Sequence, residues 1–156
     1  MKISDVNIHV LKADLSVYWF LQKVPSKVYF ALIRVLTDEG VEGDFITSTE
    51  PTGTGLDSLV EEVKSLKPIL VGSDPFDRER IMKNLVPVPS QKLYRALAVS
   101  AIDIALWDIA GKVTGFPIYK LMGAYREKIK AYASATPMKK DITVQDIVNE
   151  VLELKR

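Results

Sequence analysis

Among the side chains of types that could move a proton or bind a cation are Asp44, Asp103, Asp108 and the single histidine, His9. Carboxylates and imidazole are common general acids and bases, and carboxylates also bind hard divalent metals. The absence of cysteine excludes disulfides, thiolate metal sites and a thiol nucleophile. His9 lies where apolar and polar residues alternate, so we expect it on the surface of a strand and not in a catalytic site.

Asp103 and Asp108 interrupt an otherwise apolar or small run from residue 96 to 110, and Trp107 precedes Asp108. At about 100° per residue, this run is a helix with one apolar arc. The arc consists of Ala98, Val99, Ile102, Ala105, Leu106, Ile109 and Val113. The opposite side, which we call the mixed face, carries Leu97, Ala101, Asp103, Ile104, Trp107, Asp108, Gly111 and Lys112. Two interpretations stay open: the aspartates form local hydrogen bonds or ion pairs, or the mixed face packs on another domain.

Three predicted strands precede this helix. Residues 6–10 alternate between apolar and polar, residues 28–36 are rich in β-branched and aromatic side chains, and residues 41–48 follow a turn at 37–40. The short connection makes the second and third strands antiparallel neighbours. We therefore expect a three-stranded antiparallel meander.

Helical spacing and capping residues define the helices that follow. Apolar spacing predicts a helix over residues 56–70, and Ser73-Asp74-Pro75 predicts the capped start of a short helix that ends near Leu85. Ser90 can cap the long helix, which Gly115 and Pro117 stop before a short helical turn that ends at Gly123.

The last part of the sequence changes character again. Residues 128–135 are typical of a strand, and Thr143 with Asp146 predicts a capping box for a new helix. The apolar residues of that helix are Val144, Ile147, Val148, Val151 and Leu152. We expect the chain, which ends at Arg156 within this helix, to be the N-terminal part of a longer protein.

Composition excludes several classes of partner. Hydrophobic residues make up 47% and charged residues 26%, with a net charge of +1, so nothing favours nucleic acid or an anionic membrane. The N-terminus lacks the apolar stretch of a signal peptide, and the longest apolar run is too short and too interrupted to span a bilayer. We expect a cytoplasmic protein.

The stretch "AIDIALWDIAGKVTGFPIYKLMGA", residues 101–124, closely resembles the signature helix of the mandelate racemase and muconate lactonizing enzyme group of the enolase superfamily. Further resemblances follow in the same order: "MKISDVNIHVLKA" to the first strand, "ALIRVLTDEGVEG" to the hairpin, "DPFDRERI" to the short helix and "KIKAYAS" to the first barrel strand. The resemblance covers essentially the whole chain.

The resemblance implies an α+β fold, with a three-stranded meander followed by a helical bundle, that caps a (β/α)8 barrel. Residues 1–127 would form the capping domain, and residues 128–156 a truncated first strand and helix of the barrel. A complete barrel needs about 250 residues. The long helix would lie against the barrel, which favours the second interpretation of the mixed face.

In the family, a magnesium ion binds the carboxylate of a small substrate and stabilises the enediolate formed when a lysine or histidine removes the α-proton. The resemblance thus implies a racemase, cycloisomerase or acid-sugar dehydratase. The family carries its base and metal ligands on later barrel strands, so we assign no catalytic residue and no metal ligand in this chain. We expect the 156 residues alone to be inactive.

The resemblance also suggests residues that touch substrate. An apolar loop over residues 13–27 corresponds to a mobile flap, residues 48–55 to a second rim loop, and residues 134–136 to the end of the first barrel strand. The candidate substrate-binding residues are Tyr18, Trp19, Phe20, Thr52, Ser134 and Thr136. Local packing of the flap residues and a plain connection at the rim stay open as alternatives.

Two departures from the family pattern stand out. Many relatives have Gly-Trp-Gly-Glu where this chain has Gly43-Asp44-Phe45-Ile46, and many have a second glycine at Ala124. Because residues 43–46 depart from the pattern of many relatives, the resemblance does not identify the substrate subgroup.

A second class of function also stays open: a non-catalytic, stand-alone domain for oligomerisation or partner binding. In either case we expect a homo-oligomer. The contact would lie at or near Trp107, or strands or helices from residues 128–156 would be exchanged between copies.

Overall fold

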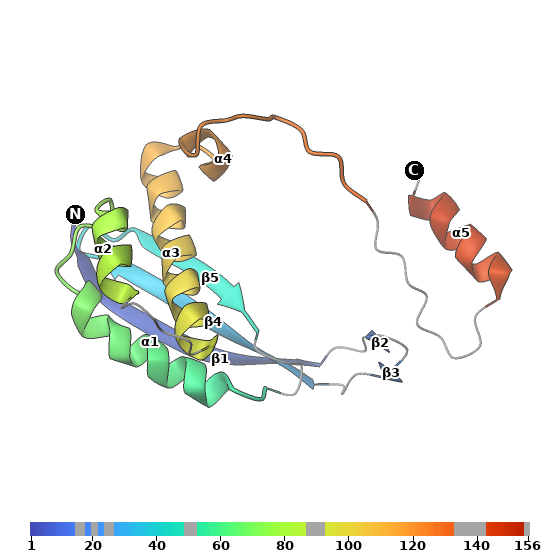
Figure 1. Cartoon of the computed structure of the whole chain (residues 1–156), viewed down its shortest axis with the longest axis horizontal. Coiled ribbons are helices and arrows are strands. Elements are labelled where there is room, and N and C mark those ends of the chain that lie inside the picture. The colour runs from blue at the N-terminus through green and yellow to red at the C-terminus, as the bar shows by residue number, and fades with distance from the viewer. Residues whose placement is uncertain are drawn as a thin grey trace.

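The computed structural model describes residues 1–14, 18–19, 22–23, 27–48, 53–86, 93–132 and 143–154. Three antiparallel strands, β1 (Ile3–Asp14), β4 (Lys27–Thr37) and β5 (Glu42–Thr47), form a sheet in the order β1-β4-β5. This order confirms the predicted meander. A second, two-stranded sheet of β2 (Tyr18–Trp19) and β3 (Gln22–Lys23) lies beyond the far end of β1 (Figure 1).

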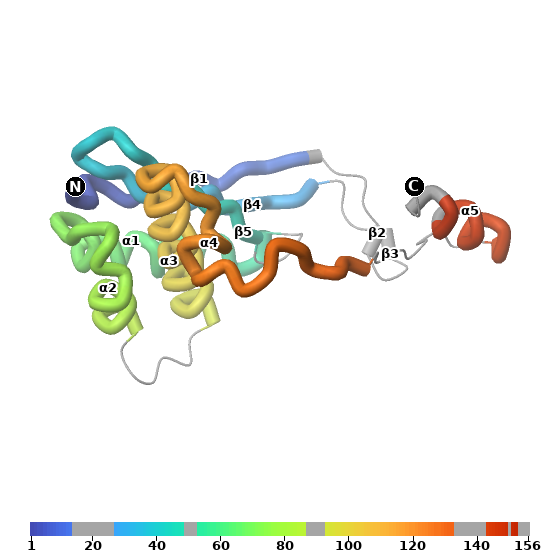
Figure 2. The backbone as a smooth tube through the Cα atoms, turned by 90° about the horizontal axis from the view of Figure 1, so that it is seen from above, coloured from blue at the N-terminus to red at the C-terminus, as the bar shows by residue number. Residues whose placement is uncertain are grey.

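Helices cover one face of the three-stranded sheet and leave the other face open (Figure 2). The helix α1 (Leu56–Leu70) packs over β1, and α3 (Leu93–Thr114) packs over β5 and β4. The shorter α2 (Arg78–Leu85) contacts both of these helices. The core lies between these two layers, where alternate strand residues such as Val6, Ile33 and Val35 meet the apolar arcs of the helices.

The long helix confirms most of the predicted apolar arc. Six of its seven predicted residues are buried, whereas Val113 is 43% exposed because no described element covers that side of the last turn. Ala101, which the helical spacing places on the mixed face and outside the apolar arc, is only 1% exposed. The covered arc is wider than predicted because α3 packs against α1 and α2 as well as the sheet.

The predicted cap of the short helix was wrong. The Asp74 carboxylate accepts a hydrogen bond from the Phe76 backbone N–H at 2.9 Å, which makes a turn, and α2 begins only at Arg78. Aspartate satisfies a nearby N–H in a turn as readily as at a helix start, so the residue type does not distinguish them. Ser90, the predicted cap of α3, lies outside the described residues.

The chain beyond α3 confirms two helices and corrects one strand. The helices are α4 (Ile118–Leu121) and α5 (Val144–Leu154). Thr143 and Asp146 form the predicted capping box: Asp146 Oδ2 accepts from Thr143 N at 2.9 Å, and Thr143 Oγ1 accepts from Asp146 N at 3.2 Å. The predicted strand 128–135 does not form over residues 128–132, and residues 133–135 are not described. Alternation alone does not make a strand without a neighbour to pair with, and no described strand lies beside this stretch.

Close contact between α3 and β5 depends on Gly43. A Cβ at this position would overlap the carbonyl oxygen of Ala105 and come within 2.7 Å of Ile109 Cγ1. The glycine thus lets the backbone of α3 lie directly on β5. Any larger residue would push the helix away from the strand.

We expect Gly43→Ala to lower the free energy of unfolding by about 3 kcal/mol, because the added methyl meets backbone that cannot move aside. Urea denaturation measures the change. Gly111→Ala is the matched control, since its Cβ would lie 3.3 Å from Phe116 O, and alanine within a helix is favoured by about 0.5–1 kcal/mol. Equal stability of Gly43→Ala and the wild-type protein would contradict the close approach.

Candidate functional site

The structure divides the charged residues of the mixed face between two neighbours. Asp108 and Lys112 lie against strand β5, and Asp103 and Trp107 lie against Arg78 of α2. The interpretation that both aspartates form local hydrogen bonds and ion pairs is confirmed. Leu97 and Ile104 on the same face are half-buried.

Asp108 and Lys112 close the outer edge of β5. Asp108 Oδ2 accepts the Asp44 backbone N–H at 2.9 Å, and Lys112 Nζ donates to the Glu42 carbonyl oxygen at 2.7 Å. Both backbone groups point away from β4. Lys112 Nζ also lies 2.7 Å from Asp108 Oδ2 and 3.3 Å from Asp44 Oδ2. We call Asp44, Asp108 and Lys112 the edge clamp, since they form an ion-pair cluster that engages two backbone groups on the free side of the edge strand.

Charges in the edge clamp hold one another ionised. Burial acts to raise the pKa of Asp44, but hydrogen bonds from Arg34, at 2.9 Å, and from Lys112 outweigh it and lower the pKa. The hydrogen bond to Asp108 raises the pKa of Lys112, against burial and with help from Asp44. A carboxylate held in its ionised form by two cations is a poor general acid or base near neutral pH.

Lys67 of α1 makes a similar contact at the other edge of the sheet. It forms an ion pair with Asp5 of β1, and its hydrogen bond lowers the pKa of that carboxyl against the effect of burial. At the start of β1, Ile3 N donates to Ser73 O and Gly72 N donates to Ile3 O, each at 2.9 Å. These contacts cover the beginning of the β1 edge.

Arg78 fastens α2 to α3. Its guanidinium lies 4.4 Å from the centre of the Trp107 ring, and its Nη1 lies 2.8 Å from Asp103 Oδ1. The side chains of Arg78 and Asp103 are 25% and 30% exposed, so water screens the pair only in part. A stacked guanidinium paired with a carboxylate fixes both helices in one arrangement.

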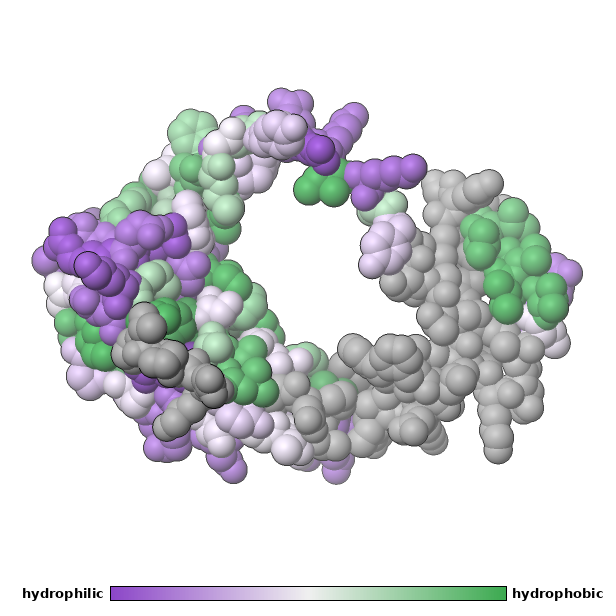
Figure 3. Space-filling model, viewed as in Figure 1, coloured by the Kyte–Doolittle hydropathy of each residue, from purple (hydrophilic) through white to green (hydrophobic). Residues whose placement is uncertain are grey.

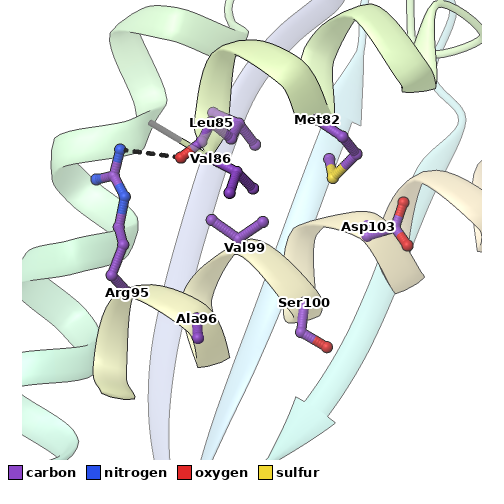
Figure 4. A pocket seen from close by; sticks show the side chains of 8 residues that line it. All are labelled: Met82, Leu85, Val86, Arg95, Ala96, Val99, Ser100 and Asp103. Carbon is purple, nitrogen blue, oxygen red and sulfur yellow. Dashed lines mark hydrogen bonds between the residues drawn. The ribbon is translucent and has the colours of Figure 1, made fainter. Parts of the chain in front are cut away.

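A groove of about 370 Å3 lies between the end of α2 and the first half of α3 (Figure 4). Its lining is mainly apolar and consists of Met82, Leu85, Val86, Arg95, Ala96, Val99, Ser100 and Asp103. Arg95 donates to Leu85 O at 3.4 Å and to Ser65 Oγ at 2.9 Å, and it pairs with Glu62 at 3.3 Å. The volume is within the range of small-ligand sites, but both charged side chains of the lining already have protein partners.

The six predicted substrate-binding residues fall almost entirely outside the described part of the chain. The backbones of Tyr18 and Trp19 form β2, paired with Lys23 and Gln22, but their side chains are not described. Phe20, Thr52, Ser134 and Thr136 lie outside the described residues, so their roles stay predictions. His9 is exposed on the open face of the sheet, opposite Leu32, as expected for a strand surface residue.

Sequence reasoning missed Arg78 and Arg95. A carboxylate in an apolar helix calls for a cation nearby, but the partner of Asp103 comes from 25 residues earlier in the chain. The sequence alone could have predicted that Asp103 pairs with a cation, but not that Arg78 supplies it.

The described residues do not fit a divalent metal. They contain no group of three histidine, cysteine, aspartate or glutamate side chains that could hold an ion. Asp44 and Asp108 come near each other, but the Lys112 ammonium lies between their oxygens.

No helix among the residues that the structure describes is long and apolar enough to cross a membrane.

The chain is similar in sequence and structure to known enzymes. The sequence model of the mandelate racemase / muconate lactonizing enzyme N-terminal domain matches residues 22–123. D-xylonate dehydratase from Haloferax volcanii is 38% identical over 106 residues, which are 65% of this chain and 24% of that protein. L-talarate/galactarate dehydratase from Salmonella typhimurium is 32% identical over 124 residues, 77% of this chain and 30% of that protein.

A solved structure of an enolase superfamily member from Polaromonas sp. JS666 matches with a TM-score of 0.76 and 27% identity, over 99% of this chain and 41% of that one. The chain therefore spans about a quarter to a third of the length of these two curated relatives.

The edge clamp predicts a specific dependence of stability on pH. In the unfolded chain the Asp44 carboxyl titrates near its ordinary pKa of 3.8, and in the folded protein below it. This difference stabilises the fold above pH 3.8 and is lost as the pH falls through the folded pKa. Asp44→Asn should therefore make the unfolding free energy fall less steeply between about pH 4 and pH 2.

Urea unfolding at several pH values measures this slope. Glu127→Gln, on an exposed stretch after α4, is the control and should keep the wild-type slope. A slope for Asp44→Asn that matches the wild type would show that the clamp does not hold this carboxylate ionised.

We expect Arg78→Ala to lower the free energy of unfolding by about 1–2 kcal/mol, because it removes the stack on Trp107 and leaves Asp103 without its cation. In a Trp19→Phe background, the emission of Trp107 should shift to the red as water reaches the ring. Arg80→Ala is the control: this side chain is 76% exposed, so its loss should cost less than about 0.5 kcal/mol. Equal effects of the two variants would exclude a special role for Arg78.

Proposed function

The chain belongs to the mandelate racemase/muconate lactonizing enzyme family, and from this membership we propose that it is the capping part of a magnesium-dependent enzyme that removes the α-proton of a small carboxylate substrate. The match of residues 22–123 to the family's N-terminal domain carries this proposal. The fold supports it, since the solved enolase superfamily member is similar in structure over 99% of this chain, with a TM-score of 0.76.

The relatives favour one of the three reaction types. Both curated relatives described above act, by name, on sugar acids as dehydratases. An acid-sugar dehydratase is therefore the reaction that we propose ahead of a racemase or a cycloisomerase. Such a reaction removes the proton beside the carboxylate and releases the neighbouring hydroxyl as water.

We assign this chain the role of covering the reaction site, not that of proton transfer. Residues 1–127 form the proposed cap, and residues 128–156 the proposed start of the barrel. Residues 128–132 would become its first strand only beside a neighbouring barrel strand, and α5 would be its first helix. Tyr18, Trp19, Phe20 and Thr52 would exclude water and shape specificity from the flap and the rim, and Ser134 and Thr136 would touch substrate from the barrel strand. Because the described residues supply no fitting metal site, no step is assigned to magnesium in this chain.

The alternative is a non-catalytic, stand-alone binding domain, and one observation fits it as well as it fits the covering role. Asp44, Asp103 and Asp108, the carboxylates that could do chemistry on the covered side of the sheet, are all engaged in ion pairs. In either function, these three carboxylates offer no poised acid or base. The two functions predict opposite results in a transplant experiment.

We expect a chimera of L-talarate/galactarate dehydratase, with its capping region replaced by residues 1–127, to keep magnesium-dependent dehydration. Trp19→Ala in this chimera should lower kcat/KM about tenfold or more, because an open flap admits water. Ile46→Ala is the control, since Ile46 is 55% exposed on the sheet and should leave turnover unchanged.

The isolated 156-residue chain, incubated with Mg²⁺ and sugar acids in D₂O, should show no α-proton exchange above buffer. Turnover by the isolated chain would refute the assignment of a covering role alone. A folded but inactive chimera would favour the binding domain.

A further inference from the structure

The turn that leads into helix α1 contains two glycines in the left-handed backbone region. Gly53 and Gly55 have φ of +81° and +83°, which glycine adopts without strain. Leu56 N donates to Gly53 O at 3.1 Å, so residues 53–56 form a tight turn. Gly55 is its third residue, the position at which a type II turn needs a positive φ. The turn joins the proposed rim loop, residues 48–55, to α1.

An aromatic ring lies on each of these glycines. A Cβ on Gly53 would come to 3.1 Å from two ring carbons of Tyr29, which belongs to β4. A Cβ on Gly55 would overlap the phenol of Tyr94, which belongs to the first turn of α3. Asparagine also adopts a positive φ, so the backbone conformation alone does not require glycine at both positions, whereas the closeness of the rings does. We call Tyr29, Gly53, Gly55 and Tyr94 the rim anchor.

Other contacts hold both rings in place. Tyr29 packs against the core, and Lys12, its partner on β1, has its Nζ 5.9 Å from the centre of the ring. Next to Tyr94, Arg95 pairs with Glu62 of α1 at 3.3 Å, which ties the first turn of α3 to α1. The turn therefore packs on two rings whose positions the fold itself determines.

Tyr29 also lies at the base of the proposed flap. Two residues beyond the Lys12–Tyr29 pair, the β1–β4 ladder reaches its last pair, Asp14 and Lys27, within the flap over residues 13–27. In Figure 1, β1 and β4 run beyond the start of α1 toward β2 and β3. The Tyr29 ring thus connects the base strands of the flap with the end of the rim loop.

The rim anchor is made entirely within the proposed cap, so it does not depend on what covers the rest of the chain. Helix α5 differs in this respect, since its apolar surface is open to view (green in Figure 3). Under the proposed function α5 belongs to the barrel, which would cover that surface.

We propose that Tyr29 and Tyr94 are positioning residues of the proposed active site, and that they fix the end of the rim loop relative to the base of the flap through Gly53 and Gly55. The inference rests on the proposed function, in which the flap and the rim loop both enclose a sugar acid. Such a substrate presents several hydroxyl groups, so loops that are already in position bind it best. A loop that the substrate has to order first lowers the affinity.

Amide hydrogen exchange in the isolated 156-residue chain tests the anchor itself. Tyr29→Ala and Tyr94→Ala should each speed exchange of the Leu56 amide at least about tenfold relative to the Ile33 amide, because the first closes the turn and the second reports opening of the whole sheet. Two controls should keep the wild-type ratio. Tyr94→Phe leaves a ring on Gly55, and Phe76→Ala removes a ring that is 49% exposed at the other end of the sheet. A wild-type ratio in both tyrosine-to-alanine variants would overturn the proposal.

Kinetics of the talarate/galactarate dehydratase chimera separate positioning from support of the fold alone. Tyr94→Ala should raise KM for the sugar acid about tenfold and leave kcat within about twofold, because the substrate must then order the loop while the proton-transfer groups are untouched. Tyr94→Phe should restore the KM of the unaltered chimera, and Phe76→Ala should not change it. A lower kcat at constant KM, or no change in either, would contradict a positioning role.

The two experiments also distinguish failure of the inference from failure of the proposed function. An inactive chimera with the unaltered cap would refute the proposed function, and the positioning role with it. An active chimera whose KM does not respond to Tyr94→Ala would refute the positioning role alone.

Discussion

The contact between the backbone of α3 and strand β5 determines how the rest of the structure is arranged. It exists because position 43 has no side chain, so that the carbonyl of Ala105 can lie where a Cβ would otherwise be. At this short separation, the side chains of Asp108 and Lys112 reach past the strand to its free backbone groups. A helix only slightly farther away would still bury apolar surface, but these short side-chain contacts with the edge would be lost.

The two aspartates in the mixed face of α3 therefore have structural roles within the domain. Asp108 accepts a hydrogen bond from the edge of β5, and Asp103 and Trp107 both contact Arg78 of α2. A charge in a long apolar helix suggests a catalytic centre when it is seen in sequence. Here the geometry shows that each charge has a protein partner, and function is supported instead by membership of the family.

The sequence predicted the elements with a clear period and missed contacts that join distant residues. Strand alternation and helical spacing gave β1, β4, β5, α1 and α5, because burial of one face imposes those periods. The start of α2 was wrong, since Asp74 bonds in a turn. The hydrogen bond between Asp44 and Asp108 spans 64 residues, and no local pattern encodes it. Residues 128–132 alternate like a strand, but pairing depends on a neighbour that alternation does not specify.

Closure of the β5 edge also affects how the chain folds while it is being synthesised on the ribosome. All pairings of the three-stranded sheet lie within residues 3–47, and the helices that pack on it end by Thr114. The sheet can therefore assemble during synthesis, as soon as α3 has left the exit tunnel. From that moment Asp108 and Lys112 occupy two of the backbone groups through which nascent chains on neighbouring ribosomes could otherwise join strand to strand.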